Sequence, residues 1–330
     1  MKVSFVVATR NRAQSILPCL NSIANALHNA RPCDGEIVAV DNGSTDETPE
    51  IIRSWAAKSS VAVQTLHEPQ AGHARAQNRA VKASRGELLA FTDDDCRLHP
   101  QYVVDLLRHD KEDRDLVLRC GRVELGDLAD LPMTISTSAF RVRWIRSENS
   151  ARHIRMGDYL HGCNMTMRRA LIERIGLFDE RFGPGGYIGS GEDTDLFYRA
   201  YLSGAALEYV PDMTVFHHHG RKSPEACRKL LRKYTTANGA IFAHYIFTDY
   251  NLCYLHYRDL RNAARRFVTG DNMRAPEFLF SNTDLLAYTA FGLLKYLFAP
   301  RAQVEKLDTK QLSDRVRMSF RKVLSLSHSE

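Results

Sequence analysis

Three consecutive carboxylates, Asp93, Asp94 and Asp95, directly follow the short apolar run of residues 88–92. Like charges packed this closely repel each other, and a divalent cation that prefers oxygen ligands, Mg²⁺ or Mn²⁺, relieves the repulsion most directly. In an extended chain Asp93 and Asp95 point to the same side, whereas Asp94 points away. The spacing therefore indicates a metal–phosphate site, and the alternative is a solvated turn or a helix cap before residues 99–100.

A second pair of carboxylates, Glu192 and Asp193, lies where a helix is predicted to begin after the glycine-rich loop of residues 182–186. Acids in a first helical turn are favoured by the helix dipole alone, by about 0.3–1 kcal/mol each, which gives them a structural explanation. A flexible loop before the helix also lets a carboxylate approach a substrate hydroxyl. The pair is therefore a candidate for general-base chemistry.

Three histidines, residues 217–219, end a predicted strand. A histidine at such a position is most often structural or on the surface. Three at a strand end can also supply an imidazole ligand for a metal held by Asp95.

These side chains need a fold that brings strand ends together. β-Branched and apolar runs predict strands at residues 3–9, 36–40, 61–66 and 88–92. Helical periodicity predicts helices between them, the second one opened by a capping box at residues 44–47. This alternation indicates a parallel, doubly wound α/β sheet with its ligand at the carboxyl ends of the strands. Asp41 follows the second strand and shares that edge.

The following part of the chain continues with mixed elements. Strands are predicted at residues 116–123, 160–167, 207–210 and 213–216. Helices are predicted at residues 100–109, 169–175 and 191–203. Residues 126–158 are less regular and carry Trp144 among arginines, which favours a variable, substrate-facing segment.

Length and composition are those of a globular protein, with 330 residues, 44% of them hydrophobic and 25% charged. Seven scattered cysteines without a CxxC pair argue against a disulfide framework and are typical of reduced, cytosolic thiols. Arginines interrupt the first apolar run, so we expect no signal peptide and a protein that stays inside the cell. Neither GxGxxG after the first strand nor GxxxxGK[ST] occurs, which removes most support for a dehydrogenase or a P-loop ATPase.

The formal charge of +6 is unevenly distributed. Residues 221–330 hold 19 Lys/Arg and 10 Asp/Glu, whereas residues 1–220 hold 26 and 29. The asymmetry suggests an anionic partner, and the alternative is an ordinary basic helical face. Because the basic part lacks a recognition motif and an aromatic stacking platform, we expect no nucleic-acid binding.

Within the basic part, residues 285–299 form an apolar stretch that is shorter than the ~20 residues of a bilayer span. One face of its helical wheel holds Leu286, Ala290, Leu293, Leu294 and Leu297, and the opposite face holds Thr289, Gly292, Lys295 and Tyr296. Followed by the basic residues 301–322, this helix fits the plane of a membrane surface. Packing on the catalytic domain and a homodimer contact are the alternatives.

Six motifs in this order and spacing resemble the family 2 inverting glycosyltransferases. They are Val6-Val7-Ala8-Thr9-Arg10-Asn11-Arg12, Val40-Asp41-Asn42-Gly43-Ser44-Thr45-Asp46, Phe91-Thr92-Asp93-Asp94-Asp95, Gly176-x-Phe178-Asp179-Glu180-x-Phe182, Gly191-Glu192-Asp193-Thr194-Asp195 and Pro211-x5-His217. The resemblance spans about residues 1–220. It implies a GT-A fold with a nucleotide-sugar half (1–125) and an acceptor half (126–220), followed by a basic, mainly helical region (221–330).

The resemblance also implies roles for individual residues. Those that it places around the donor nucleotide are Thr9, Arg10, Arg12, Asp41, Gly72, Asn78, Asp93 and Asp94. Asp41 would bind the base, Asp95 would coordinate Mn²⁺ or Mg²⁺ with Asp93 and His217, and Asp193 would be the general base with Glu192 beside it. One departure is Gln77, which stands where the family commonly has an arginine, so that Arg75 or Arg79 would have to compensate.

The leading hypothesis is an inverting glycosyltransferase that moves a sugar from a nucleotide-sugar, UDP by the family resemblance, to a glycan or lipid-linked acceptor. A sugar-nucleotide pyrophosphorylase is disfavoured because the chain lacks a glycine-rich N-terminal phosphate loop. A non-catalytic nucleotide-sugar or glycan-binding partner of a polysaccharide machine stays open. We expect a cytoplasmic protein at the inner face of the cell membrane.

Overall fold

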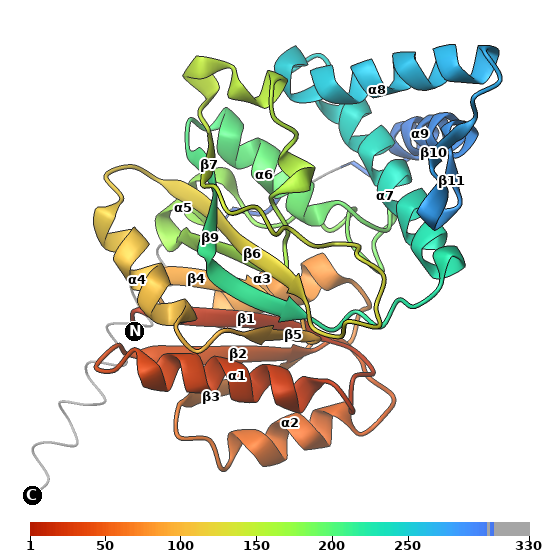
Figure 1. The fold of residues 1–330 in the computed structure, drawn as a ribbon. Helices are drawn as coiled ribbons and strands as arrows, with labels where there is room; N and C mark the ends of the chain where they lie inside the picture. Colours follow the sequence, from red (N-terminus) through yellow and green to blue (C-terminus); the bar gives the residue numbers. More distant parts are fainter. Residues whose placement is uncertain (302–303, 307–330) are drawn as a thin grey trace, which may run out of the picture.

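A mixed sheet occupies the centre of the molecule (Figure 1). The computed structural model describes residues 1–301 and 304–306, and within them nine strands form this sheet. The strands are β1 (Val3–Thr9), β2 (Gly35–Asp41), β3 (Ala62–His67), β4 (Leu88–Thr92), β5 (Cys96–Leu98), β6 (Val117–Leu125), β7 (Val142–Trp144), β8 (Asn164–Arg168) and β9 (Ala206–His217). Their order is β3-β2-β1-β4-β8-β6-β9-β5, with β7 paired to β9.

The first four strands confirm the predicted parallel α/β arrangement, since β3, β2, β1 and β4 all run in one direction. The sheet becomes mixed at β8, which lies antiparallel to both β4 and β6. β9 then runs parallel to β6. The second half of the sheet therefore adds strands in both directions.

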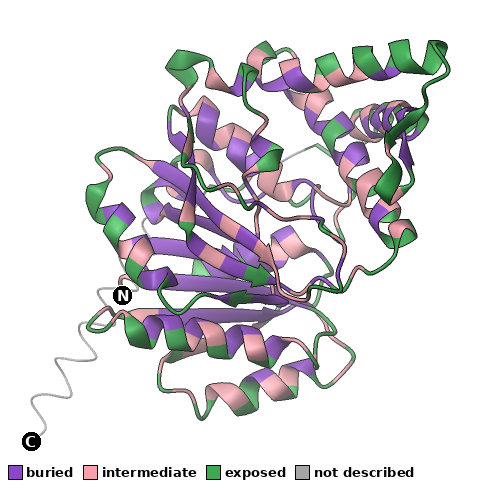
Figure 2. Ribbon diagram, in the orientation of Figure 1, coloured by how far each residue is buried: buried purple, intermediate pink, exposed green. Residues whose placement is uncertain are grey.

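Helices cover both faces of the sheet. They are α1 (Ile16–Asn29), α2 (Thr48–Ala56) and α4 (Tyr102–Glu112) on one face, and α3 (His73–Ala83), α5 (Arg169–Ile175) and α6 (Glu192–Leu202) on the other. In β1 the side chains of Val3, Phe5 and Val7 enter the core under α1, α2 and α4. Val6 and Ala8 enter the core on the other face, under α3, α5 and α6. Burial on both sides explains why β1 is apolar except at Ser4 and Thr9 (Figure 2).

Several element boundaries differ from the predictions. The capping box predicted at residues 44–47 does not form, since the N-cap of α2 is Glu47 and its side chain makes no capping bond. Asp46 accepts a hydrogen bond from the backbone N–H of Thr48 at 3.1 Å. The predicted strand at 160–167 begins only at Asn164, and the three-residue β5 has too little pattern to be predicted.

The two strands predicted at 207–210 and 213–216 are one strand, β9, with a register shift against β6. Pro211 lies in this irregular part, where a missing N–H is tolerated. The side-chain amide of Asn164 donates to the carbonyls of Arg122 and Met213 at 2.8 Å each, which satisfies backbone groups that the shift leaves out of the ladder. Gly121 is required there, because a Cβ would stand 1.9 Å from the Met213 carbonyl oxygen.

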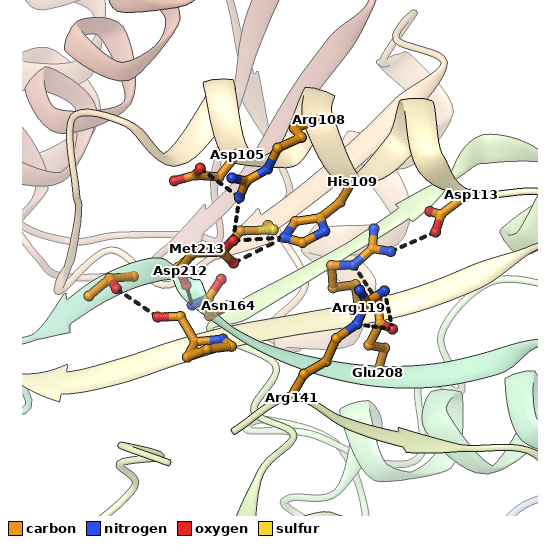
Figure 3. A network of polar contacts seen from close by, with 12 residues as sticks. Asp105, Arg108, His109, Asp113, Arg119, Arg141, Asn164, Glu208, Asp212 and Met213 are labelled. Carbon is orange, nitrogen blue, oxygen red and sulfur yellow. Dashed lines mark hydrogen bonds and ion pairs between the residues drawn. The ribbon is translucent and has the colours of Figure 1, made fainter. Parts of the chain in front are cut away.

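An ion network around the buried Glu208 joins β6 and β9 to Arg141, the residue before β7 (Figure 3). The Glu208 carboxylate is fully buried and accepts hydrogen bonds from Arg119 Nε and Arg141 Nε, both at 2.7 Å. Arg119 also donates to Asp113 at 2.7 Å. Each buried charge therefore has a partner of opposite sign.

The C-terminal region contains α7 (Pro224–Tyr245), α8 (Tyr250–Val268) and α9 (Asn282–Leu297), with a small ribbon of β10 (Met273–Ala275) and β11 (Phe280–Ser281). Figure 1 shows the three helices gathered together at one end of the molecule. α9 packs on α7 through glycines, since a Cβ on Gly292 would stand 1.9 Å from the Thr236 carbonyl oxygen.

The predicted orientation of the 285–299 helix is wrong in part. Thr289 and Gly292, assigned to the polar face, are buried against α7, because small residues allow close helix contact. On the predicted apolar face Leu294 and Leu297 are exposed, whereas Leu286 and Leu293 are half-buried. Phe291 and Phe298 are exposed as well. Most of the basic residues 301–322 lie outside the described residues. None of the described helices is both long and apolar enough to cross a membrane.

Candidate active site

The ends of several strands meet at one edge of the sheet. β1 and β2 are in register, so that Thr9 lies directly opposite Asp41. β9 reaches the same edge because its last residue, His217, pairs with Cys96 in β5, the residue after Asp95. The topology therefore brings His217 to the aspartates, although they are far apart in the sequence.

Asp93, Asp95 and His217 form a possible metal-binding set. One ligand atom from each residue lies within 4.8 Å of the others. Asp95 Oδ1 is buried without a hydrogen-bond partner among the described residues, although His217 Nε2 lies 3.3 Å from it. Two carboxylates and an imidazole around an unsatisfied oxygen fit a divalent cation such as Mn²⁺ or Mg²⁺.

The charges in this set are strongly coupled. Burial alone would lower the pKa of His217, but the Asp95 carboxylate outweighs burial and raises that pKa to about 9. Burial would raise the pKa of Asp95, yet His217 and Arg12 hold it below its usual value. A cation therefore competes with a proton on His217 for this site.

Asp94 turns toward β1 instead. Its Oδ2 accepts a hydrogen bond from Thr9 Oγ1 at 2.6 Å, and its Oδ1 lies 3.3 Å from Arg12 Nε. Burial raises the pKa of Asp94 to about 6. Arg12 Nη2 also lies 3.6 Å from Asp95, so this arginine bridges two of the three carboxylates.

The end of β2 is fixed by its neighbours. Asp41 Oδ2 lies 2.9 Å from His67 Nδ1 at the end of β3, and Asp41 Oδ1 accepts from the N–H of Ser44 at 3.1 Å. Asn42 accepts a hydrogen bond from the N–H of Gly72 at 2.8 Å. Gly72 caps α3 with φ 157°, near extended backbone. The bond between Asn42 and Gly72 therefore brings the end of β2, with Asp41, next to the start of α3.

Asp193 lies in the first turn of α6 with its carboxylate held by backbone groups. Oδ2 accepts from the N–H of Gly162 at 3.1 Å, and Oδ1 accepts from the N–H of Thr194 at 2.7 Å. The N-cap Gly191 has φ 89°, a left-handed conformation that favours glycine. Burial raises the pKa of Asp93, and the charges of Asp95 and then of Asp193 raise it further.

Glu192 has a different environment from Asp193. Its side chain is 13% exposed, and its Oε1 lies 4.0 Å from His73 Nε2 at the start of α3. Burial, and then the charge of Asp193, raise the pKa of Glu192 to about 8. At neutral pH Glu192 is therefore mainly protonated, and Asp193 is the better candidate for a base.

Other predicted residues have contacts that sequence reasoning did not anticipate. The Asn78 side chain binds the backbone of Phe178 in both directions, at 2.9 and 3.0 Å. Arg10 is exposed. The nucleotide-binding roles of both residues stay predictions.

Gln77, which stands where the family commonly has an arginine, lies in α3. Gln77 is buried, and its Oε1 has no hydrogen-bond partner among the described residues. Arg75 lies 2.9 Å from Glu180 and Arg79 lies 3.6 Å from Glu68. Both candidate replacements for the missing arginine therefore have acidic partners in this structure.

Sequence reasoning missed three residues near the site, namely His67, His73 and Tyr234. Burial raises the pKa of the Tyr234 phenol, and the charges of Asp193 and Asp93 raise it further. The helix α7 packs against the start of α6, since a Cβ on Gly191 would stand 3.1 Å from the Ala237 Cβ. A histidine at a strand end was a usable signal for His67. Nothing in the sequence around Tyr234 indicates that α7 folds back onto α6.

A family model and several relatives match this chain. The family model described as glycosyl transferase family 2 matches residues 4–176. Glycosyltransferase AglE of Haloferax volcanii is 26% identical over 233 residues, which cover 70% of this chain and 71% of AglE. The succinoglycan biosynthesis protein ExoU of Rhizobium meliloti is 26% identical over 220 residues, 63% of this chain and 59% of ExoU.

EpsH of Bacillus subtilis is 27% identical over 215 residues, 63% of this chain, and the match spans 58% of EpsH, less than two thirds of its length.

Solved structures share the fold at low sequence identity. The mannosyltransferase PcManGT from Pyrobaculum calidifontis, in complex with GDP-Man and Mn²⁺, superposes with a TM-score of 0.60 at 19% identity, covering 90% of this chain and 87% of PcManGT. TarS 1–349 of Staphylococcus aureus superposes with a TM-score of 0.54 at 17% identity, covering 94% and 98%. These similarities confirm the predicted fold class.

Proposed function

This chain belongs to glycosyl transferase family 2 and has the GT-A fold, and we propose that it is a metal-dependent, inverting transferase. In this proposal it moves a sugar from a nucleotide-sugar, with UDP as the first candidate, to a hydroxyl of a glycan or lipid-linked acceptor. The acceptor would belong to surface polysaccharide or glycolipid biosynthesis. The relative named for succinoglycan biosynthesis supports this substrate class.

The observation that carries the proposal is the juxtaposition of two acidic groups with different surroundings. Asp93 and Asp95 lie with His217 in a set that fits a divalent cation. Asp193 lies near enough for its charge to raise the pKa of Asp93, but two backbone N–H groups hold its carboxylate on α6. A cation held by Asp93, Asp95 and His217 can bind the diphosphate of the donor, and Asp193 can accept the proton of the acceptor hydroxyl.

The chemistry needs no protein nucleophile. The acceptor oxygen forms a bond to the anomeric carbon, the bond from that carbon to the diphosphate oxygen breaks, and the hydroxyl proton passes to Asp193. A cation bound by Asp93, Asp95 and His217 would neutralise the charge that develops on the diphosphate. A single displacement inverts the anomeric configuration and gives a β-linkage from the usual α-linked donor.

Arg12 is suited to a second task in the donor site. Its guanidinium forms ion pairs with Asp94 at 3.3 Å and with Asp95 at 3.6 Å, and its side chain is 48% exposed. We propose that Arg12 holds the donor near these acids, with Thr9 and Asp94 fixing its position. Asp41, held by His67 and Ser44, would bind the base.

The proposed division of the chain assigns donor binding to residues 1–125, acceptor binding to 126–220 and a basic extension to 221–330. We further propose that the protein works in the cytoplasm at the inner face of the cell membrane. The exposed side chains of Phe291, Leu294, Leu297 and Phe298 on and after α9 support a membrane contact. A homodimer through the same apolar side chains is the competing proposal.

The experiment is a thermal-shift panel of UDP, GDP, CDP and dTDP with and without Mn²⁺, on the wild type and on Asp95→Ala. A ligand at about 100 times its dissociation constant adds about 2.7 kcal/mol to the free energy of unfolding. We expect one nucleotide to raise the melting temperature only with Mn²⁺, and Asp95→Ala to abolish the effect. No shift with any nucleotide would contradict a donor site.

Turnover distinguishes the enzyme from a non-catalytic binding partner. Asp193→Asn should leave the metal-dependent nucleotide shift intact and lower release of nucleoside diphosphate from the donor. Glu192→Gln is the matched control, because Glu192 is already mainly protonated at neutral pH. Equal donor hydrolysis in wild type and Asp193→Asn would favour the binding-partner alternative.

A further inference from the structure

A cavity of about 130 Å³ lies between the segment 151–160 and the helices α6, α7 and α8. Its wall is mixed: Met156, Phe197, Ile241 and Leu252 supply an apolar part, and polar side chains supply the rest. Its size is close to that of apolar cavities of about 150 Å³ that hold benzene. The cavity therefore has room for a small apolar group, but not for an extended chain.

The cavity adjoins Asp193 along two segments. Thr194 lines it, and Thr194 Oγ1 lies 3.3 Å from Asp193 Oδ1. Leu160 lines it as well, and the same segment continues to Gly162, whose N–H donates to Asp193. A molecule that presents its hydroxyl to Asp193 would therefore lie beside this cavity.

Among the polar lining residues, Arg155 donates to Asp259 at 2.8 Å and Tyr198 donates to the Leu252 carbonyl at 3.2 Å. This leaves Asn238 and His256 as candidates for contacts with a ligand.

Asn238 on α7 is exposed, so the cavity opens to solvent beside it. His256 on α8 contributes Nε2, which is buried without a hydrogen-bond partner among the described residues. Burial lowers the pKa of His256 to about 4, so the imidazole is neutral at pH 7 and can donate or accept one hydrogen bond. The imidazole packs against the Phe242 ring, with centroids 5.4 Å apart and the ring planes tilted by 53°.

We propose that this cavity is an acceptor subsite that binds the acetamido group of an N-acetylamino sugar. The methyl group lies against the apolar wall, and the amide bonds to His256 Nε2, which otherwise has no partner. A 6-deoxy methyl group or an isoprene unit would leave that nitrogen unsatisfied, which costs free energy. The inference rests on the proposed function and specifies its acceptor class.

The test measures binding of simple glycosides to the full chain by saturation-transfer NMR. The probes are methyl N-acetyl-β-glucosaminide, methyl β-glucoside and the 6-deoxy sugar methyl α-rhamnoside. We expect the acetamido methyl to receive the strongest saturation, and the N-acetyl probe to bind about tenfold more tightly than the glucoside, from a buried methyl and one hydrogen bond.

Two variants localise the binding. Asn238→Trp changes an exposed residue and should block the cavity without unfolding the protein, and thereby abolish acetamido saturation. His256→Phe should weaken the N-acetyl probe about fivefold and leave the glucoside unchanged. Phe267→Trp, at the exposed end of α8, is the matched control and should bind as the wild type does.

Equal binding of the N-acetyl and plain glycosides, preference for the 6-deoxy sugar, or acetamido saturation that survives Asn238→Trp would each overturn the assignment. The glycoside probes bind without a donor, so this result is independent of the nucleotide shift. A wild type that binds nucleotide with Mn²⁺ but shows no acetamido preference refutes the subsite alone. A wild type that prefers the N-acetyl probe but shows no nucleotide shift with Mn²⁺ refutes the donor site alone.

Discussion

The carboxylate of Asp193 and the backbone N–H of Gly162 are hydrogen-bonded at 3.1 Å, and a Cβ on Gly162 would stand 2.9 Å from the Cβ of Asp193. The bond joins the start of α6 to the loop before β8, two segments that approach only in the folded chain. The absence of a side chain at position 162 is what lets the N–H reach the carboxylate. The direction of the candidate base is thus set by a glycine 31 residues away.

Gly162→Ala should therefore displace Asp193 while preserving donor binding. A real Cβ contact under 3.0 Å must be relieved by movement, and a misplacement of about 1 Å can cost about 100-fold in rate. We expect donor turnover to fall between about tenfold and 100-fold. The measurement is kcat and KM for donor hydrolysis, with the nucleotide thermal shift as the control. An unchanged kcat would show that Asp193 is not positioned by this contact.

Glu192 predicts a pH dependence of stability. Its pKa is about 8 in the folded protein and 4.5 in the reference state, so the native state keeps a proton that the unfolded chain releases. Stability of the wild type should therefore fall as pH rises from about 4.5 through 8. Glu192→Gln removes this contribution, so its melting temperature should gain on the wild type as pH rises through that window.

The measurement is the melting temperature of both proteins between pH 5 and 8.5 in a chelator, which removes competing metal. Curves that stay parallel over the whole range would mean that Glu192 is ionised in the folded protein at neutral pH.

We expect His217→Ala to weaken the Mn²⁺ dependence of the nucleotide thermal shift less than Asp95→Ala does. His217→Ala leaves two carboxylates for the cation, whereas Asp95→Ala removes a ligand that also holds Arg12. We expect His217→Ala to raise the Mn²⁺ concentration needed for the nucleotide shift by about 10–100-fold, a range typical of losing a supporting group at a metal site. A Mn²⁺ titration of the thermal shift measures it, with His218→Ala as the neighbouring control. An unchanged titration would exclude His217 as a ligand.

Much of the sheet and of its functional edge could be predicted from sequence, because local patterns encode them. The apolar run that ends at Asp93 and the run that ends at Asp41 both read as buried strands, and parallel strands share an edge. The packing of α7 against the start of α6, at Gly191 and Ala237, could not be predicted, because it joins segments that are far apart in the sequence. The orientation of α9 was missed for a similar reason, since close packing at Gly292 outweighs its apolar face.

The ion network around Glu208 predicts a large, local loss of stability. Glu208→Gln removes the carboxylate that Arg119 and Arg141 share, so a buried guanidinium loses part of its neutralising charge. Breaking a buried pair in this way typically costs about 3–5 kcal/mol, and the remaining bond from Arg119 to Asp113 favours the lower value. Urea denaturation measures the change. The control is Glu50→Gln, which breaks the exposed pair with Arg53 and should change the free energy of unfolding by less than about 1 kcal/mol. Equal effects of the two substitutions would mean that the Glu208 network is as well solvated as a surface ion pair.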